Sequence, residues 1–288
     1  MKLNYRLMSM TESAFWLAFP KLSADMRTGY RLMLELNHAY NMDCMQGMAQ
    51  FPDGYFDLAV VDPPYGGAGN TFKCSDKTRF GGRFDRYRST APAVQNLAGG
   101  GYSITRTGGA WAAKYGKKII AWDNAPRPEY FDELFRVSKQ QIIWGGNYFD
   151  LPPCRCFLIW NKPNIPADFT MAQCEFAWCS LNENAKLISL SSTRSKDAKH
   201  WHPTEKPIGL YDWIFRLFCH PGDKILDTHL GSGNSRKAAY DAGLDFIGFE
   251  VDPEYYAKGC ADFDAYAAQQ SLFRQMAAES AGEQLCLL

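Results

Sequence analysis

The chain of 288 residues lacks several features that mark common classes of protein. It contains no run of about 18 apolar residues, the length at which a helix can cross a lipid bilayer. Its first residues have neither the apolar stretch nor the cleavage site of a secretion signal. No internal repeat is evident, and the formal net charge is zero. These absences favour a globular, cytoplasmic protein without a membrane contact.

The cysteines form no recognisable framework. Their number, nine, is odd, no Cys-x-x-Cys pair occurs, and several lie inside apolar runs. We therefore expect reduced, buried thiols rather than disulfides. Cys154 and Cys156 have no matching His or Cys pair at the spacing of a zinc finger, so no metal site is expected.

Charge is unevenly distributed along the chain, although its net value is zero. Residues 66–127 hold eleven basic and three acidic residues, whereas the chain after Leu244 is acidic. So long a stretch with weak periodicity is typical of a functional loop, and its basic side chains could follow the phosphates of a nucleic acid. A solvated loop with an incidental basic excess is the alternative.

Apolar runs and their spacing predict strands alternating with helices, which favours an α/β fold. Strands are expected at 38–43, 56–61, 140–144, 157–160, 176–178, 224–227 and 245–250. Helices are expected at 11–36 (one or two), 44–50, 128–138, 208–218 and 234–242, and the C-terminal residues are helical or frayed.

The tetrapeptide Asp62-Pro63-Pro64-Tyr65 is the most informative element of the chain. It directly follows the apolar run 56–61, which is typical of a buried parallel strand. The prolines end the strand, because neither can donate a backbone N–H, and they stiffen the backbone. An acid and an aromatic ring are thereby fixed at the carboxyl end of a strand, where open α/β sheets bind their ligands. A turn-capping Asp followed by a surface loop is the alternative.

Glycines mark a second junction between a strand and a helix. The predicted strand 224–227 ends at Asp227, and Gly231-Ser232-Gly233-Asn234 opens the next helix. Glycines at such a turn let a ligand approach the backbone, and Glu250, which ends the following strand, is positioned for ribose hydroxyls. A nicotinamide-binding domain would share this pattern, but Arg236 occupies the place of its third glycine.

Taken together, these elements resemble the permuted β-class DNA amino-methyltransferases, which modify adenine N6 or cytosine N4. The segments similar to successive family motifs are 41–44, 57–66, 143–149, 202–207, 223–234 and 245–256. The hexapeptide from His202 to Pro207 is specific in this order. The resemblance implies a Rossmann-like, S-adenosylmethionine-dependent fold with a mostly parallel seven-stranded sheet, helices on both faces and the catalytic half first in the chain.

The resemblance also implies roles for individual residues. Asp62 and a backbone carbonyl of the Pro63-Pro64 turn would accept hydrogen bonds from the amine of a flipped base, and Tyr65 would hold the base by stacking. The residues implied to bind S-adenosylmethionine are Asp43, Thr204, Lys206, Asp227, Gly231, Ser232, Gly233, Asn234 and Glu250.

Several of these residues have alternative interpretations. Asp43, implied to contact the adenine of the cofactor, would also serve as a helix N-cap. Lys206, implied to border the methionine end of the cofactor with Thr204, could equally be a solvated lysine. Asn147, implied to orient the base loop, could be an ordinary turn residue.

The chain departs from the family pattern at two places. Thr228 and His229 stand where family members usually have Pro-Phe, so the packing of an aromatic ring on the cofactor is altered or lost. The segment 181–201, where target recognition is expected, is short, so base readout would rely partly on the basic segment 66–127.

An acid as the first motif residue favours adenine N6 over cytosine N4, which remains the alternative. A catalytically inactive nucleic-acid-binding protein is a more distant alternative, opposed by the intact motifs. The expected partner is DNA, in the cytoplasm of a bacterial or phage-infected cell, and a homodimer and a cognate restriction nuclease are left open.

Overall fold

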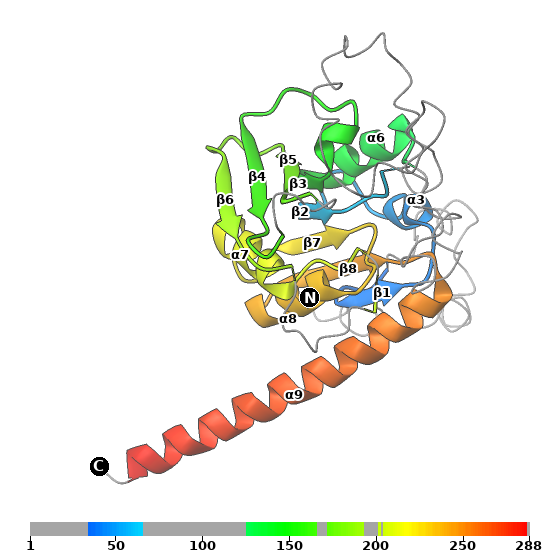
Figure 1. The fold of residues 1–288 in the computed structure, drawn as a ribbon. Helices are drawn as coiled ribbons and strands as arrows, with labels where there is room; N and C mark the ends of the chain where they lie inside the picture. Colours follow the sequence, from blue (N-terminus) through cyan, green and yellow to red (C-terminus); the bar gives the residue numbers. More distant parts are fainter. Residues whose placement is uncertain (1–33, 66–124, 166–171, 193–200, 203, 287–288) are drawn as a thin grey trace, which may run out of the picture.

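Eight strands form one sheet among the residues that this computed structural model describes, which are 34–65, 125–165, 172–192, 201–202 and 204–286. All neighbouring strands are parallel except β5, which is antiparallel to β3 and β4 (Figure 1). In the order in which they pair, the strands are β1 (His38–Tyr40), β8 (Asp245–Phe249), β7 (Lys224–Asp227), β2 (Phe56–Val61), β3 (Ser138–Trp144), β5 (Cys174–Cys179), β4 (Cys156–Asn161) and β6 (Lys186–Ser189).

Helices cover both faces of this sheet (Figure 1). They are α3 (Cys44–Met48), α6 (Pro128–Val137), α7 (Ile208–Phe218), α8 (Asn234–Ala242) and α9 (Pro253–Cys286), with a short 3-10 turn η3 (Gly146–Tyr148). Helices α7 and α8 contribute to one apolar core cluster, and α3 and α6 contribute to the other.

Strand β2 shows why the sheet is buried on both sides. Leu58 and Val60 belong to the cluster with α7 and α8, whereas Ala59 and Val61 belong to the cluster with α3 and α6. Successive side chains of a strand point to opposite faces, so a continuous apolar run fills both layers. This is the signature from which the sequence predicted a buried parallel strand.

Helix α9 begins against the domain and then runs away from it (Figure 1). Near its start, Tyr256 donates a hydrogen bond to the backbone oxygen of Ala39, and the Phe263 ring packs edge-on against Tyr240 of α8. In the part of the chain that the structure describes, no helix combines the length and the apolar character needed to cross a membrane.

The sequence predicted the mostly parallel sheet but gave the wrong strand count of seven. The additional strand is β6, which adds to the edge of the sheet beside β4 and lies inside the expected target-recognition segment 181–201. It has only four residues and its burial is partial, so its apolar pattern was too short to be recognised. The strand expected at 38–43 ends at Tyr40. The expected helices at 11–36 and the segment 66–127 lie almost wholly outside the described residues.

The direction of chain crossover reverses between β2 and β7. The chain passes from β2 through α6 to β3 on one side, and from β7 through α8 to β8 on the other. Open α/β sheets bind ligands outside the carboxyl ends of the strands at such a switch point. Asp62 directly follows β2 and Asp227 ends β7, so the two predicted sites meet at this place.

Candidate functional site

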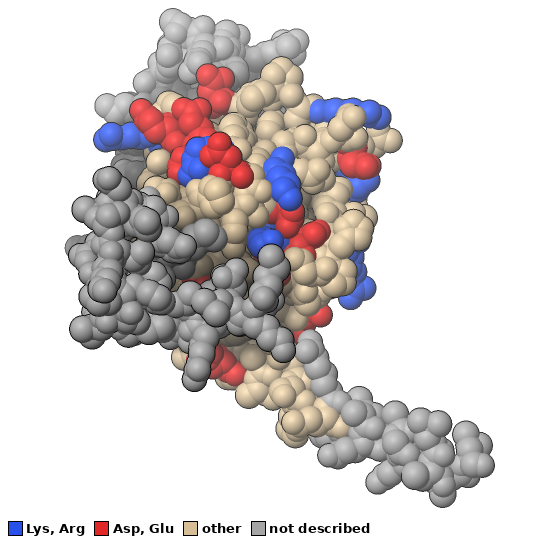
Figure 2. All heavy atoms as spheres, turned by 180° about the vertical axis from the view of Figure 1, so that it is seen from behind, with Lys and Arg blue, Asp and Glu red and all other residues tan. Residues whose placement is uncertain are grey.

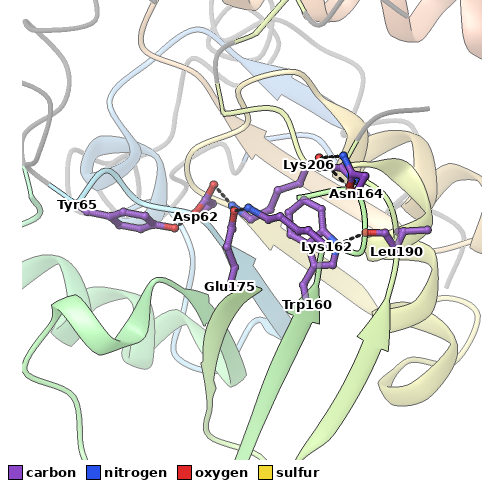
Figure 3. A network of polar contacts seen from close by, with 9 residues as sticks. Asp62, Tyr65, Trp160, Lys162, Asn164, Glu175, Leu190 and Lys206 are labelled. Atoms are coloured by element: carbon purple, nitrogen blue, oxygen red, sulfur yellow. Dashed lines mark hydrogen bonds and ion pairs between the residues drawn. The ribbon is translucent and has the colours of Figure 1, made fainter. Parts of the chain in front are cut away.

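Asp62 lies at the switch point with both of its carboxylate oxygens already engaged (Figure 3). The Tyr65 hydroxyl donates to Oδ1 at 2.7 Å, and the Lys206 ammonium donates to Oδ2. A carboxylate offers about four acceptor directions, so each oxygen keeps room for one more donor. The Asp62 side chain is 15% exposed, which leaves it reachable from outside the sheet.

Tyr65 forms an aromatic platform beside this carboxylate. Its ring stacks on Tyr148 of η3, with centroids 4.8 Å apart, and meets the Phe149 ring edge-on. Gly145 makes this position available, because a Cβ there would lie 2.1 Å from the Tyr65 ring. Gly145 also has φ +68°, a backbone conformation that favours glycine. Burial and the nearby carboxylates raise the pKa of Tyr65, so its hydroxyl remains a donor.

Lys206 was predicted at the edge of the cofactor pocket, and in the structure its ammonium contacts Asp62. A second carboxylate oxygen, Oε2 of Glu175, lies 3.3 Å from the same ammonium (Figure 3). Burial lowers the pKa of Lys206, but the two carboxylates outweigh it and raise the pKa above its usual value. The Asn234 side chain donates to the Lys206 backbone oxygen at 2.8 Å and so ties this loop to the start of α8.

Glu175 and Lys162 complete the cluster, and neither was predicted. Glu175 lies in β5, and the Lys162 ammonium, just beyond the end of β4, contacts its Oε1. The Lys162 ammonium also lies 4.7 Å from the centre of the Trp160 ring, a cation–π contact. Burial raises the pKa of Glu175, but the ammonium groups of Lys206 and Lys162 outweigh it, so the carboxylate stays ionised. An acid inside the apolar run of β5 was the one sequence signal for this group.

The glycine turn holds a second set of acidic groups at the same edge of the sheet. Asp227 is buried, and burial raises its pKa to about 7 although the Ser235 hydroxyl and the His229 N–H donate to it. Glu250 accepts a hydrogen bond from the Gly231 N–H at 2.9 Å, and burial raises its pKa too. Gly231 and Gly233 have φ of +53° and +74°. These are backbone conformations that residues with a Cβ adopt only with strain, so the turn favours glycine at both positions.

Two further predicted residues, Thr204 and Ser232, lie near or within this turn. The Thr204 hydroxyl lies 3.4 Å from Nδ1 of His202, whose ring packs against Gly231, and Ser232 is buried in the turn itself. Burial and the charge of Lys206 lower the pKa of His202 to about 4, so this ring is neutral at pH 7. Thr204 is thus linked to the glycine turn through His202, and its role beside the cofactor stays a prediction.

Asp43 acts as the N-cap of α3. Its Oδ1 accepts hydrogen bonds from the backbone N–H groups of Met45 and Gln46, which would otherwise lack partners. This is the alternative role that the sequence offered, and it leaves the other carboxylate oxygen without a contribution to the cap. Asn147 lies exposed in η3, next to the aromatic platform.

Thr228 and His229, the residues that depart from the family pattern, form a hydrogen-bonded chain with Tyr130. The Tyr130 and Thr228 hydroxyl oxygens are 2.6 Å apart, and Thr228 Oγ1 lies 2.9 Å from Nδ1 of His229. Burial lowers the pKa of His229 to about 4. The two substitutions therefore introduce a neutral polar chain beside the glycine turn.

The described residues offer no cluster of three or more His, Cys, Asp or Glu side chains suited to a metal ion. On the face seen from behind, acidic and basic side chains are interspersed on the described surface (Figure 2). The basic excess of the sequence lies instead in the segment 66–127, of which the structure describes only the end.

Comparison with known proteins links this geometry to one family. A model of the N6/N4 methyltransferase family, described as DNA methylase, matches residues 185–259. The type II methyltransferase M2.MboI of Moraxella bovis is 26% identical over 241 residues, which cover 75% of this chain and 83% of the relative. The type II methyltransferase M1.MboII of the same species is 25% identical over 253 residues, which cover 77% and 95%.

A shorter match is more similar in sequence. The DNA adenine methyltransferase YhdJ of Escherichia coli K12 is 36% identical over 72 residues, which cover 24% of each chain. The family model matches the part of the chain that contains α7, β7, α8 and β8, and the two longer relatives extend the match over three quarters of the chain. Residues 185–259 thus match the N6/N4 family of DNA methylases, and the chain as a whole is similar to type II methyltransferases over three quarters of its length.

Proposed function

We propose that this protein transfers a methyl group from S-adenosylmethionine to the N6 amine of an adenine that has been flipped out of DNA. The observation that carries the proposal is the position of Asp62 at the switch point. Its carboxylate contacts the Lys206 ammonium, keeps free acceptor directions and adjoins the Tyr65–Tyr148 platform. A planar base with an exocyclic amine fits such a site.

Asp62 would act on the amine as a hydrogen-bond acceptor. The lone pair of an exocyclic amine is delocalised into the ring, which makes the nitrogen a poor nucleophile. When Asp62 and a backbone carbonyl of the Pro63-Pro64 turn accept its two N–H groups, a pyramidal nitrogen is favoured and the lone pair becomes available. Positive charge grows on the nitrogen as it gains the methyl group, and the negative charge of Asp62 stabilises it.

Tyr65 and Tyr148 would hold the flipped base. Flipping costs a few kcal/mol, and stacking on an aromatic side chain offsets about 1–3 kcal/mol per base. Tyr148 is 61% exposed, so one side of the platform is open to an incoming ring. The hydrogen bond that the Tyr65 hydroxyl donates to Asp62 keeps this carboxylate oriented before the base arrives.

The turn after β7 fits S-adenosylmethionine, which supplies an electrophilic methyl group when bound. The glycines at 231 and 233 allow close approach of a ligand, and Glu250 holds a carboxylate beside them for ribose hydroxyls. Ser232, Asn234 and Asp227 would shape the methionine end from the same turn. Asp43, the N-cap of α3 beyond strand β1, would contact the adenine of the cofactor with the carboxylate oxygen that does not cap the helix.

Adenine N6 is preferred here over cytosine N4 for two reasons. An acid as the first motif residue more often accompanies adenine in this class, and one relative is named a DNA adenine methyltransferase. Cytosine N4 carries the same kind of amine, so it is the alternative target. Digestion of treated DNA to nucleosides followed by mass spectrometry identifies the modified base directly: N6-methyladenine supports the proposal, and N4-methylcytosine supports the alternative.

DNA would be contacted by the basic segment 66–127 and by the target-recognition segment 181–201, which includes β6. The cytoplasm of a bacterial or phage-infected cell and a cognate restriction nuclease belong to the same proposal, because the longer relatives are bacterial type II methyltransferases. Calorimetry with S-adenosylmethionine and with NAD separates this function from that of a nicotinamide enzyme. Cofactor binding without methyl transfer would instead favour the inactive nucleic-acid-binding protein.

A further inference from the structure

We propose that Lys206, Glu175 and Lys162 form a charge-balanced support for Asp62, in which Lys206 is a positioning residue and Glu175 offsets its charge. The inference rests on the proposed function, because it concerns how Asp62 acts on an amine. It assigns Lys206 to the catalytic carboxylate rather than to the cofactor.

The four charged groups form a row in which the sign of charge alternates (Figure 3). Asp62 contacts Lys206, Lys206 contacts Glu175, and Glu175 contacts Lys162. They come from four separate places in the chain, namely the ends of β2 and β4, the interior of β5 and the loop before α7. With all four ionised, the row has no net charge.

Burial makes this balance matter. The two lysine side chains are 5% and 7% exposed, and Glu175 is 27% exposed. Charges that are shielded from water interact strongly, and an unpaired charge in such a place is costly. Each of these shielded groups therefore has a partner of opposite charge. Removal of one charge changes the electrostatic field at the next group.

Lys206 fixes the orientation of Asp62. Its ammonium holds Oδ2 while the Tyr65 hydroxyl holds Oδ1, so rotation of the carboxylate would break one of the two contacts. The lysine backbone is itself held through Asn234. The remaining acceptor directions of Asp62 are thus presented in one orientation, as a catalytic group requires for an efficient reaction.

Glu175 limits the effect of the Lys206 charge on the stabilisation that Asp62 gives to the attacking nitrogen. A cation in contact with Asp62 opposes the positive charge that grows on the attacking nitrogen. Glu175 lies 3.3 Å from the same cation and offsets much of that repulsion. Lys162 then holds Glu175 in place and returns the row to neutrality. The support orients Asp62 while it leaves its negative charge effective.

Charge-matched variants test this inference. Glu175→Gln leaves the row with an excess positive charge, and we expect the rate constant kcat for methyl transfer to fall by roughly tenfold. A change of this size corresponds to the interaction energies found between neighbouring residues. The dissociation constant for S-adenosylmethionine should change little. The double variant Glu175→Gln, Lys162→Met is neutral again and should recover most of the lost kcat. Lys206→Met should lower kcat, and Lys206→Arg should recover part of it.

Lys237→Met is the matched control. Lys237 is equally buried, at 6% exposed, and contacts Asp262 of α9 rather than the row. This variant should lose stability in urea without loss of kcat. A double variant no faster than Glu175→Gln would overturn the charge balance, and a Lys206→Met variant that loses cofactor affinity at unchanged kcat would overturn the positioning role. Failure of the proposed function would give a different result from failure of this inference, because the unaltered protein itself would then form no methylated nucleoside.

Discussion

Gly145→Ala offers a direct test of the link between backbone geometry and the aromatic platform. The added Cβ would lie 2.1 Å from the Tyr65 ring, so the ring must move. The φ of +68° adds about 1–2 kcal/mol of strain for a residue with a Cβ. Displacement of Tyr65 from Tyr148 forfeits about 0.5–1.5 kcal/mol more, the size of an aromatic pair.

Gly243→Ala separates these two contributions. Gly243 has nearly the same φ, +67°, but a Cβ there would meet nothing within 4 Å. Urea unfolding should therefore show that the added strain lowers the free energy of unfolding of both variants. The decrease should be larger in Gly145→Ala. The larger difference should appear in methyl transfer to DNA. Stacking on an aromatic ring contributes about 1–3 kcal/mol per base, so kcat/KM should fall by roughly tenfold or more in Gly145→Ala alone. Equal kcat/KM values in the two variants would refute the role of the platform.

Three other predictions concern the cofactor turn, pH and salt. Glu250→Ala should weaken S-adenosylmethionine binding measured by calorimetry, and unchanged affinity would remove Glu250 from the ribose site. The unfolded chain protonates His229 near pH 6.5 and the folded chain only near pH 4, so its contribution to stability is gained as pH rises between these values. His229→Asn should reduce the slope of unfolding free energy against pH there by up to about 1.4 kcal/mol per unit, and an unchanged slope would contradict the assigned burial. DNA affinity should fall steeply with salt if the segment 66–127 binds phosphates, whereas a flat log–log plot would exclude it.

The secondary structure was largely predictable because the apolar runs are bounded by turn residues. The bounds of β2, β7, α7 and α8 agree with the prediction. Strand β6 was missed because four residues with alternating partial burial resemble a polar loop. A local sequence pattern identifies a strand or helix only when its apolar residues recur over enough positions.

The partners of Asp62 could not be predicted in the same way. Its position at a strand end followed from the prolines, but its contact with Lys206 joins residues 144 positions apart. Nothing in the local sequence of Lys206 distinguishes a contact with Asp62 from one with a cofactor. Glu175 and Lys162 reach the site only because antiparallel β5 inserts between β3 and β4. Such contacts depend on the order of strands, which the sequence did not provide.

The central claim is that the Asp62 carboxylate accepts hydrogen bonds from the amine that is methylated. The most direct test is mass spectrometry of nucleosides from DNA treated with the unaltered protein and with Asp62→Ala, at equal saturation with S-adenosylmethionine. We predict N6-methyladenine with the unaltered protein and none above background with the variant, whose cofactor affinity stays nearly unchanged. Methylation by Asp62→Ala at a rate close to that of the unaltered protein would contradict the account.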